Sequence, residues 1–271
     1  DAAESLPSAG ERAAWELADA FLSERVDGYR DDRNLPGLDA TSRLSPHLKW
    51  GTIHPRQLLD RLGDRAGEVT WATELAWREF YADVLFHRPD TITANYVDTM
   101  DGLRWDEGKQ ADERFDAWCQ GRTGYPIVDA GMRQLLAEGW MHNRVRMITA
   151  SFLVKDLHVD WRRGARWFMQ HLIDGDIASN THGWQWTAGT GTDAAPFFRV
   201  FNPTLQATRF DPDGDYVRRH VPELASIEGG AVHEPWKASG DLFGGGASDY
   251  PDPIVDHAAE RDEALQRYQQ R

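Results

Sequence analysis

The chain has 271 residues, of which 41% are hydrophobic and 27% charged. This balance is typical of a globular protein and excludes extended disorder. Because no apolar run reaches about 18 residues, a membrane-spanning helix is excluded as well. The single cysteine, Cys119, excludes an internal disulfide and any CxxC metal site, which favours a reducing, intracellular compartment.

The charge is strongly acidic but uneven along the chain. The net charge is −14, and only four of the 30 basic residues are lysines. Two explanations stay open: an acidic surface kept soluble by self-repulsion, as in salt-loving organisms, or a GC-rich genome that favours Arg over Lys. Residues 139–171 nevertheless hold six basic and two acidic residues. Such a locally basic face can bind phosphate even on an acidic protein.

Apolar residues recur mostly at helical spacing. In chain order, we expect helices over 12–29, from Pro55, over 71–87 and 126–138, from Trp161 after an N-cap at Asp160, and over 256–270. The segments between them are expected to be loops at 28–45, 89–114, 174–196 and 201–216, with a surface loop at 239–253. Alternating strand patterns are almost absent, so the sequence predicts an all-α fold with one domain over 1–271.

Twelve tryptophans are an unusual number for this length. Most are expected to fill the core between helices. A second interpretation is functional, because indoles are oxidised easily enough to pass an electron between a buried redox centre and the surface. Trp105, Trp161 and Trp184 are candidates, although their spacing does not say whether they meet in space.

The helix expected over 71–87 carries a chemically mixed face. Glu74, Trp77, Arg78 and Tyr81 are spaced at i, i+3, i+4 and i+7 and therefore share one side. Such a group could bracket a planar ligand or a flipped base. The simpler interpretation is an ion pair between Glu74 and Arg78 beside partly buried aromatic rings.

Two other segments could bind a cofactor. Residues 41–46, Thr-Ser-Arg-Leu-Ser-Pro, could form an anion cradle suited to a pyrophosphate, or only an N-cap at Ser45. Arg146 could pair with Asp174, and Asp176 could accept a hydrogen bond from a heterocyclic N–H. A turn or a metal loop is the alternative at 174–176, but the carboxylate spacing makes calcium improbable. No GxGxxG and no HExxH motif is present.

Taken together, six segments resemble the FAD-binding domain of the photolyase/cryptochrome family, and they occur in the family's order. They are TSRLSPHLKWG (41–51), ELAWREFY (74–81), GRTGYPIVDAGMRQL (121–135), GWMHNRVRMITASFLVKDL (139–157), LIDGDIASNTHGWQW (172–186) and TGTDAAPFFRVFNP (190–203). The nearest resemblance is to microbial class I photolyases that repair cyclobutane pyrimidine dimers.

The resemblance implies an all-helical domain that holds a U-shaped FAD, active in its reduced form. It implies cofactor contacts at Tyr29, Thr41, Ser42, Arg43, Leu44, Ser45, Arg78, Tyr81, Asn143, Arg146, Asp174, Gly175, Asp176 and Asn180. It implies DNA contacts at Arg33, Glu74, Trp77, Tyr81, Asn143, Arg144 and Gln206. It implies catalytic roles for Glu74, Trp77, Asn180 and Met147. Trp184, Trp161 and Trp105 match an electron-transfer chain, from the flavin outward.

The resemblance also sets the expected activity. The reduced flavin, excited by light, would give an electron to a dimer flipped out of DNA, and the cyclobutane ring would split. A cryptochrome-type light sensor with the same FAD and tryptophans is the alternative. Repair of (6-4) lesions ranks lower, because such relatives usually have His in place of Asn143. A helical domain that binds DNA without flavin is the plainest alternative.

Relatives in this family carry an N-terminal α/β antenna domain, which is absent from this sequence. A second chromophore is therefore not expected on this chain. The first residue is Asp1 rather than Met, which suggests a fragment. We expect a monomer in the cytoplasm, with damaged DNA as its partner and neither a metal nor a membrane.

Overall fold

The computed structural model describes residues 6–196, 199–238 and 249–271, and within these ranges every regular element is a helix. This confirms the all-α prediction. The α-helices are α1 (Glu11–Glu24), α2 (Tyr29–Asp32), α3 (Ser45–Trp50), α4 (Pro55–Leu59), α5 (Ala66–His87), α6 (Lys109–Cys119), α7 (Pro126–Glu138), α8 (Asn143–Ser151), α9 (Trp161–His171), α10 (Ile177–Ala188), α11 (Pro203–Phe210), α12 (Asp215–His220), α13 (Pro235–Ala238) and α14 (His257–Gln269). The short 3-10 helices are η1 (Pro89–Ile92), η2 (Asp98–Met100), η4 (Pro222–Leu224) and η5 (Gly229–His233), and η3 (Phe152–Asp156) is a π-helix.

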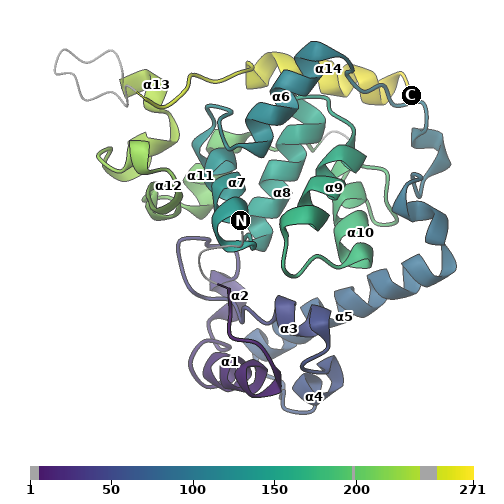
Figure 1. The fold of residues 1–271 in the computed structure, drawn as a ribbon, viewed down its shortest axis with the longest axis vertical. Coiled ribbons are helices and arrows are strands. Elements are labelled where there is room, and N and C mark those ends of the chain that lie inside the picture. Colours follow the sequence, from purple (N-terminus) through teal and green to yellow (C-terminus); the bar gives the residue numbers. More distant parts are fainter. Residues whose placement is uncertain (1–5, 197–198, 239–248) are drawn as a thin grey trace.

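The core is divided into two apolar clusters. The smaller cluster joins α1 to α4 and the first half of α5 through residues such as Phe21, Leu58 and Trp71. The larger cluster is built around Trp118, Phe152 and Trp161 from the helices that follow. Figure 1 shows α1, α3 and α4 at one end of the molecule, α7 to α10 at its centre, and α6 with α14 at the opposite end. Between the two clusters, α10 packs against both α5 and α8.

Helices with clear end signals are predicted well. α7 begins at Pro126 and ends before Gly139, whose φ of 64° is the left-handed conformation that glycine tolerates. The Asp160 side chain accepts a hydrogen bond from the backbone N–H of Arg162, so it caps α9 as expected. The 256–270 helix is confirmed as α14, capped by Asp256.

The prediction of a loop over 174–196 is wrong, because α10 occupies its centre. The segment lacks an apolar stripe, and Thr181 and Gly183 are poor helix formers. Its ends nevertheless carry helix signals: the Asp176 side chain accepts from the Ser179 N–H, and Gly189 has a φ of 77°. These caps hold a helix whose interior propensity is weak.

The other loop predictions are wrong in part. The segment 28–45 contains α2, 89–114 contains η1, η2 and the start of α6, and 201–216 contains α11 and the start of α12. α11 begins with an Asn202 cap and Pro203, a signal that the sequence did contain. The expected 12–29 helix ends at Glu24. Of the surface loop expected at 239–253, residues 239–248 lie outside the described residues.

A π-helical turn follows α8 directly. η3 buries Lys155 and Asp156, which are 1% and 0% exposed. Nδ1 of His257 on α14 lies 2.5 Å from Oδ1 of Asp156, and the Lys155 ammonium donates to the Arg199 carbonyl at 2.7 Å. The turn therefore fastens α14 to the rest of the chain.

Candidate functional site

A cavity of about 570 Å³ opens between α3, α5, α8 and the segment before α10. A smaller space of about 150 Å³ continues from it toward α9 and shares Asn143, Arg146 and Met147 with it. The larger cavity is lined by these predicted cofactor residues: Tyr29, Thr41, Ser42, Arg43, Leu44, Ser45, Arg78, Tyr81, Asn143, Arg146, Asp174 and Asp176. Gly175 and Asn180 line the smaller one. The structure thus brings all the predicted cofactor residues to one connected space.

Further lining residues come from positions that the sequence did not single out. They are Leu48, Lys49, Trp71, Leu75, Trp140, Met141, Ser179, Gly183, Trp186 and Asp193. Ser179 and Gly183 follow Asp176 by three and seven residues, so α10 aims one face at the cavity. Helical spacing would have found them if the segment had been predicted as a helix.

The loop before α3 places one basic side chain, Arg43, at the cavity. Arg43 has a φ of 53°, an uncommon conformation for a residue other than glycine. Its guanidinium lies 3.8 Å from the Trp140 ring centre and 3.2 Å from the Glu138 carboxylate. The interpretation of Ser45 as a plain N-cap is wrong: α3 begins at Ser45 itself, and its hydroxyl accepts from the Trp140 indole N–H at 3.2 Å.

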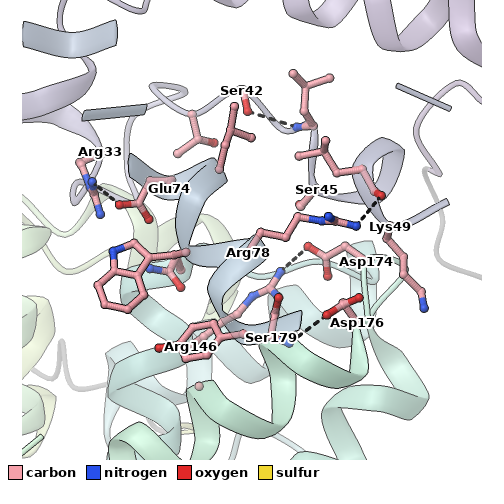
Figure 2. Close-up of a pocket in the computed structure, with 18 of the residues that line it drawn as sticks. Arg33, Ser42, Ser45, Lys49, Glu74, Arg78, Arg146, Asp174, Asp176 and Ser179 are labelled. Atoms are coloured by element: carbon pink, nitrogen blue, oxygen red, sulfur yellow. Dashed lines mark hydrogen bonds and ion pairs between the residues drawn. The ribbon is translucent and has the colours of Figure 1, made fainter. Parts of the chain in front are cut away.

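The opposite side of the cavity holds a buried carboxylate with one unpartnered oxygen. Arg146 donates to Oδ2 of Asp174 at 2.8 Å, which confirms the predicted pair. The Asp174 side chain is 2% exposed, and its Oδ1 is buried without any hydrogen-bond partner. A buried acceptor left in this state is costly, so it marks a position where a ligand N–H is expected. Figure 2 shows Asp174 and Asp176 facing the cavity from the side opposite Glu74.

The mixed face of α5 lines the cavity, but its ion pair differs from the expected one. Glu74 pairs with Arg33 at 2.7 Å rather than with Arg78. Arg78 instead pairs with Glu79 at 3.0 Å and donates to the Leu48 carbonyl at 3.3 Å. The correction has a simple cause, since Arg33 reaches Glu74 from the segment after α2, which packs on α5. Figure 2 shows Arg33 and Glu74 together at one edge of the cavity.

Three rings are stacked in a column along this edge. Trp77 lies over Tyr81 at 5.8 Å, and Tyr81 lies nearly parallel to His182 at 5.6 Å and 9°. Trp77 is 38% exposed, whereas His182 is 1% exposed and neither of its ring nitrogens has a partner. Burial lowers the pKa of His182, so the ring is neutral, and burial raises the pKa of Tyr81, reinforced by Asp193 and Glu74. His182 was missed because it lies in the predicted loop.

The start of α8 supplies the floor of the cavity. His142 caps this helix by accepting from the Arg144 N–H, and burial, followed by the charges of nearby arginines, lowers its pKa to about 3. A neutral His142 fixes the first turn of α8, from which Asn143, Arg146 and Met147 reach the cavity.

Two predicted DNA-contact residues lie outside the cavity lining. The Arg144 guanidinium donates to Asn34 Oδ1 at 2.8 Å and lies 4.4 Å from the Phe210 ring centre. Gln206 is half-buried on α11. Asn180, predicted to act beside the flavin, donates to the Ala165 carbonyl at 2.9 Å at the margin of the smaller space.

Of the three predicted electron-transfer tryptophans, Trp184 lines the smaller of the two described cavities, and neither Trp161 nor Trp105 lines either of them. Trp161 is fully buried and donates to Asn95 Oδ1 at 3.0 Å, while Trp105 is partly buried against the larger cluster. The ring of Trp184 lies directly over Gly164, one turn along α9 from Trp161. Trp184 is thus the member of the three that lies at the described cavity space.

The described part of the chain contains neither a metal-binding cluster nor a membrane-spanning helix. Within residues 6–196, 199–238 and 249–271, no group of three or more His, Cys, Asp or Glu side chains could hold a metal ion. None of the helices that the structure describes is long and apolar enough to cross a membrane.

Comparison with known proteins identifies the family. Residues 71–270 match the FAD-binding domain of DNA photolyase. The chain is 47% identical over 268 residues to a deoxyribodipyrimidine photo-lyase of Escherichia coli, covering 96% of this chain and 56% of that protein.

Solved structures agree with this match. A class III photolyase from Agrobacterium tumefaciens superposes with a TM-score of 0.87 and 45% identity, and a cryptochrome from Synechocystis with 0.85 and 34%. Each comparison covers 96% of this chain and 56% of the other. The chain thus spans just over half the length of these relatives. It belongs to the photolyase FAD-binding domain family.

Proposed function

We propose that this chain binds FAD in the described cavity and repairs cyclobutane pyrimidine dimers in DNA in a light-dependent reaction. The observation that carries the proposal is that one cavity has both a buried hydrogen-bond acceptor and an exposed aromatic platform. A buried acceptor, Asp174, faces the cavity, and an exposed aromatic platform, Trp77 over Tyr81, stands at its edge beside the Arg33–Glu74 pair. The first suits a heterocyclic cofactor and the second a base taken out of the duplex.

The residues present fit a flavin dinucleotide. A volume of about 570 Å³ is within the range of cofactor sites. Arg43, Lys49 and Arg78 line it and would attract the diphosphate. The orphaned Oδ1 of Asp174 would accept the ring N–H of the isoalloxazine, and Arg146 would favour negative charge on the ring. We propose that Asn180 and Gly175 contact the ring from the smaller space.

The cofactor would supply the chemistry: reduced flavin, once excited by near-ultraviolet or blue light, gives an electron to the dimer and receives it back after the ring splits. The chain would hold the dimer in place. Flipping costs a few kcal/mol, and stacking on Trp77 offsets part of it, at about 1–3 kcal/mol per base. Glu74, held by Arg33, would accept a pyrimidine N3–H, and Met147 would pack beside the dimer. Arg144 and Gln206 would contact the flanking backbone.

The test is direct. The chain is reconstituted with FAD, reduced under anaerobic conditions, mixed with an oligonucleotide that carries a thymine dimer, and illuminated. Loss of dimer in light but not in darkness is the expected result. Flavin photoreduction without dimer loss would instead support a light sensor of the cryptochrome type. A preparation that cannot be loaded with flavin would contradict the proposal outright.

A matched pair of variants separates lesion binding from folding. Trp77→Ala removes the exposed ring and should weaken binding of dimer-containing DNA about tenfold or more, by the stacking energy of one base. Phe86→Ala, on the same helix and 81% exposed, removes a ring that is neither among the cavity-lining residues nor in ring contact with Trp77, and it should leave that affinity unchanged. Equal losses in the two variants would argue against a platform at Trp77.

We further propose that residues 1–271 act as one catalytic domain, that the protein is a monomer and that it works in the cytoplasm. The acidic surface, with a net charge of −14, is expected to limit the number of DNA phosphates contacted. The affinity for DNA should therefore fall less steeply with salt than for a basic protein.

A further inference from the structure

Trp184 lines the smaller space that adjoins the proposed cofactor cavity, and its ring contacts lead away from Trp161. Its ring is 2% exposed and lines the smaller cavity. It meets Phe168 at 5.0 Å and Trp118 at 6.0 Å, both edge to face. Trp118, from α6, is therefore in direct ring contact with the cavity wall.

The contacts continue from Trp118 to the edge of the fold. Trp118 stacks on Phe115 at 5.8 Å and 21°, and Phe115 meets Trp167 at 6.4 Å. Phe115 and Trp167 are only partly buried. Trp118 itself is completely buried, and its indole N–H donates to the Thr149 carbonyl at 3.0 Å. A hydrogen bond from the N–H to a carbonyl stabilises the ring when it carries positive charge.

The charges beside the two routes differ. The Arg162 guanidinium lies 4.7 Å from the ring centre of Trp161, where it opposes the positive charge that oxidation creates, although Asp160 offsets part of it. On the other route the nearest cation, Arg163, lies 4.3 Å from Phe115, and it is paired with Asp112 at 2.8 Å. Phe115 is too hard to oxidise and serves only as a bridge. No cation lies over Trp118 among the ring contacts of the described residues.

We propose that Trp184 is a branch point, and that Trp118, Phe115 and Trp167 form a second route by which electrons reach the cofactor during photoreduction. This rests on the proposed binding of FAD. Trp184 gives one electron to the photoexcited oxidised cofactor, Trp118 refills Trp184, and Trp167 refills Trp118 across Phe115. A thiol in solution then reduces Trp167. After two such transfers, two thiols have become one disulfide, and the two electrons and two protons that they released have reduced the FAD.

The experiment measures photoreduction of oxidised FAD in the full chain, in blue light with dithiothreitol. Two parallel routes predict that Trp161→Phe and Trp118→Phe each slow the reaction only about twofold, and that the double variant slows it about tenfold or more. Phe keeps a ring at each position, so packing is largely retained. Trp236→Phe, which removes a tryptophan packed against the same core, should have no effect.

A second readout does not depend on the rate. After illumination in air without thiol, peptide mapping by mass spectrometry should find oxygen added by dissolved dioxygen at Trp167. Trp118→Phe should abolish this oxidation and leave any oxidation of Trp105 in place. If Trp167 stays unmodified and Trp118→Phe has no effect in the Trp161→Phe background, the branch is refuted.

Failure of the branch and failure of the proposed function can be told apart. Every variant is checked for bound FAD by its visible absorption, for folding by thermal denaturation, and for dimer splitting after chemical reduction of the flavin. Splitting should be unchanged in all of them, because the reduced cofactor no longer needs electrons from tryptophan. If the unsubstituted chain binds no FAD or splits no dimer, the proposed function is at fault rather than the route.

Discussion

Asp129 and Asp174 are both buried carboxylates, yet the fold treats them in opposite ways. Oδ1 of Asp129 accepts from the Thr123 N–H and hydroxyl, both at 2.7 Å, and Oδ2 accepts from the Gly124 N–H at 3.0 Å and the Tyr250 hydroxyl at 2.5 Å. Asp174 has Arg146 on one oxygen and nothing on the other. The difference separates a carboxylate that holds loops together from one that is left open toward a cavity.

The largest effect should come from Asp129→Asn. The amide NH₂ of Asn would face N–H and O–H donors that need an acceptor. Two hydrogen bonds to a charged group are then lost, which should lower the free energy of unfolding by about 4 kcal/mol in total. Urea unfolding measures this loss. The FAD bound per folded molecule should stay the same. A loss below about 1 kcal/mol would contradict a structural role for this carboxylate.

Asp156 is an intermediate case that pH can test. Its Oδ2 is buried without a partner, and burial raises its pKa from 3.8 to about 6, although His257 and Lys155 oppose the shift. Folded Asp156 therefore keeps its proton to a higher pH than unfolded Asp156. Its contribution to stability is present below about pH 4 and falls as pH rises to about 6, by roughly 3 kcal/mol.

Asp156→Asn should remove that part of the pH dependence. Urea unfolding between pH 4 and pH 7 gives the two curves, with Glu16→Gln as a surface control. A variant with the same slope as the unsubstituted chain would show that Asp156 ionises normally.

Asp174→Asn should change cofactor binding more than folding. The amide can still accept from Arg146, but the charge that would meet the ring N–H is gone, at a cost of about 2 kcal/mol. The dissociation constant for FAD should rise about 30-fold, while unfolding of the FAD-free chain shifts by less than about 1 kcal/mol. Fluorescence titration of FAD measures the first quantity. An unchanged affinity would remove Asp174 from the site.

The smallest effect is expected at an exposed carboxylate. Glu16 pairs with Arg12 at 3.6 Å, and their side chains are 70% and 94% exposed. Glu16→Gln should change the unfolding free energy by less than about 0.5 kcal/mol, and less still in high salt. If urea unfolding shows a larger loss of unfolding free energy, the exposure of a carboxylate does not by itself predict how much it contributes to stability.

Local signals explain which parts of the fold and site were predictable. Proline, glycine and capping residues fix the bounds of α7, and Asp160 fixes the start of α9, because these effects act within one turn. The Arg146–Asp174 pair was predictable because the two side chains have opposite charges and Asp174 lies in a segment expected to turn. The partner of Glu74 did not, since Arg33 reaches it through tertiary packing. The position of His182 was equally invisible, because α10 is held by its caps and its neighbours rather than by a stripe of its own.

The π-helical turn after α8 has a consequence for how the molecule is joined together. A π-turn contains one residue more than an α-helical turn. Deleting one residue from 152–156 would restore regular winding and rotate everything before it by about 100° relative to everything after it. Asn143 and Met147 would swing away from the opening that they line, while Asp156 kept its hold on α14. This single extra residue therefore sets the rotation of α8, which faces the cavity, relative to the end of η3, which holds α14.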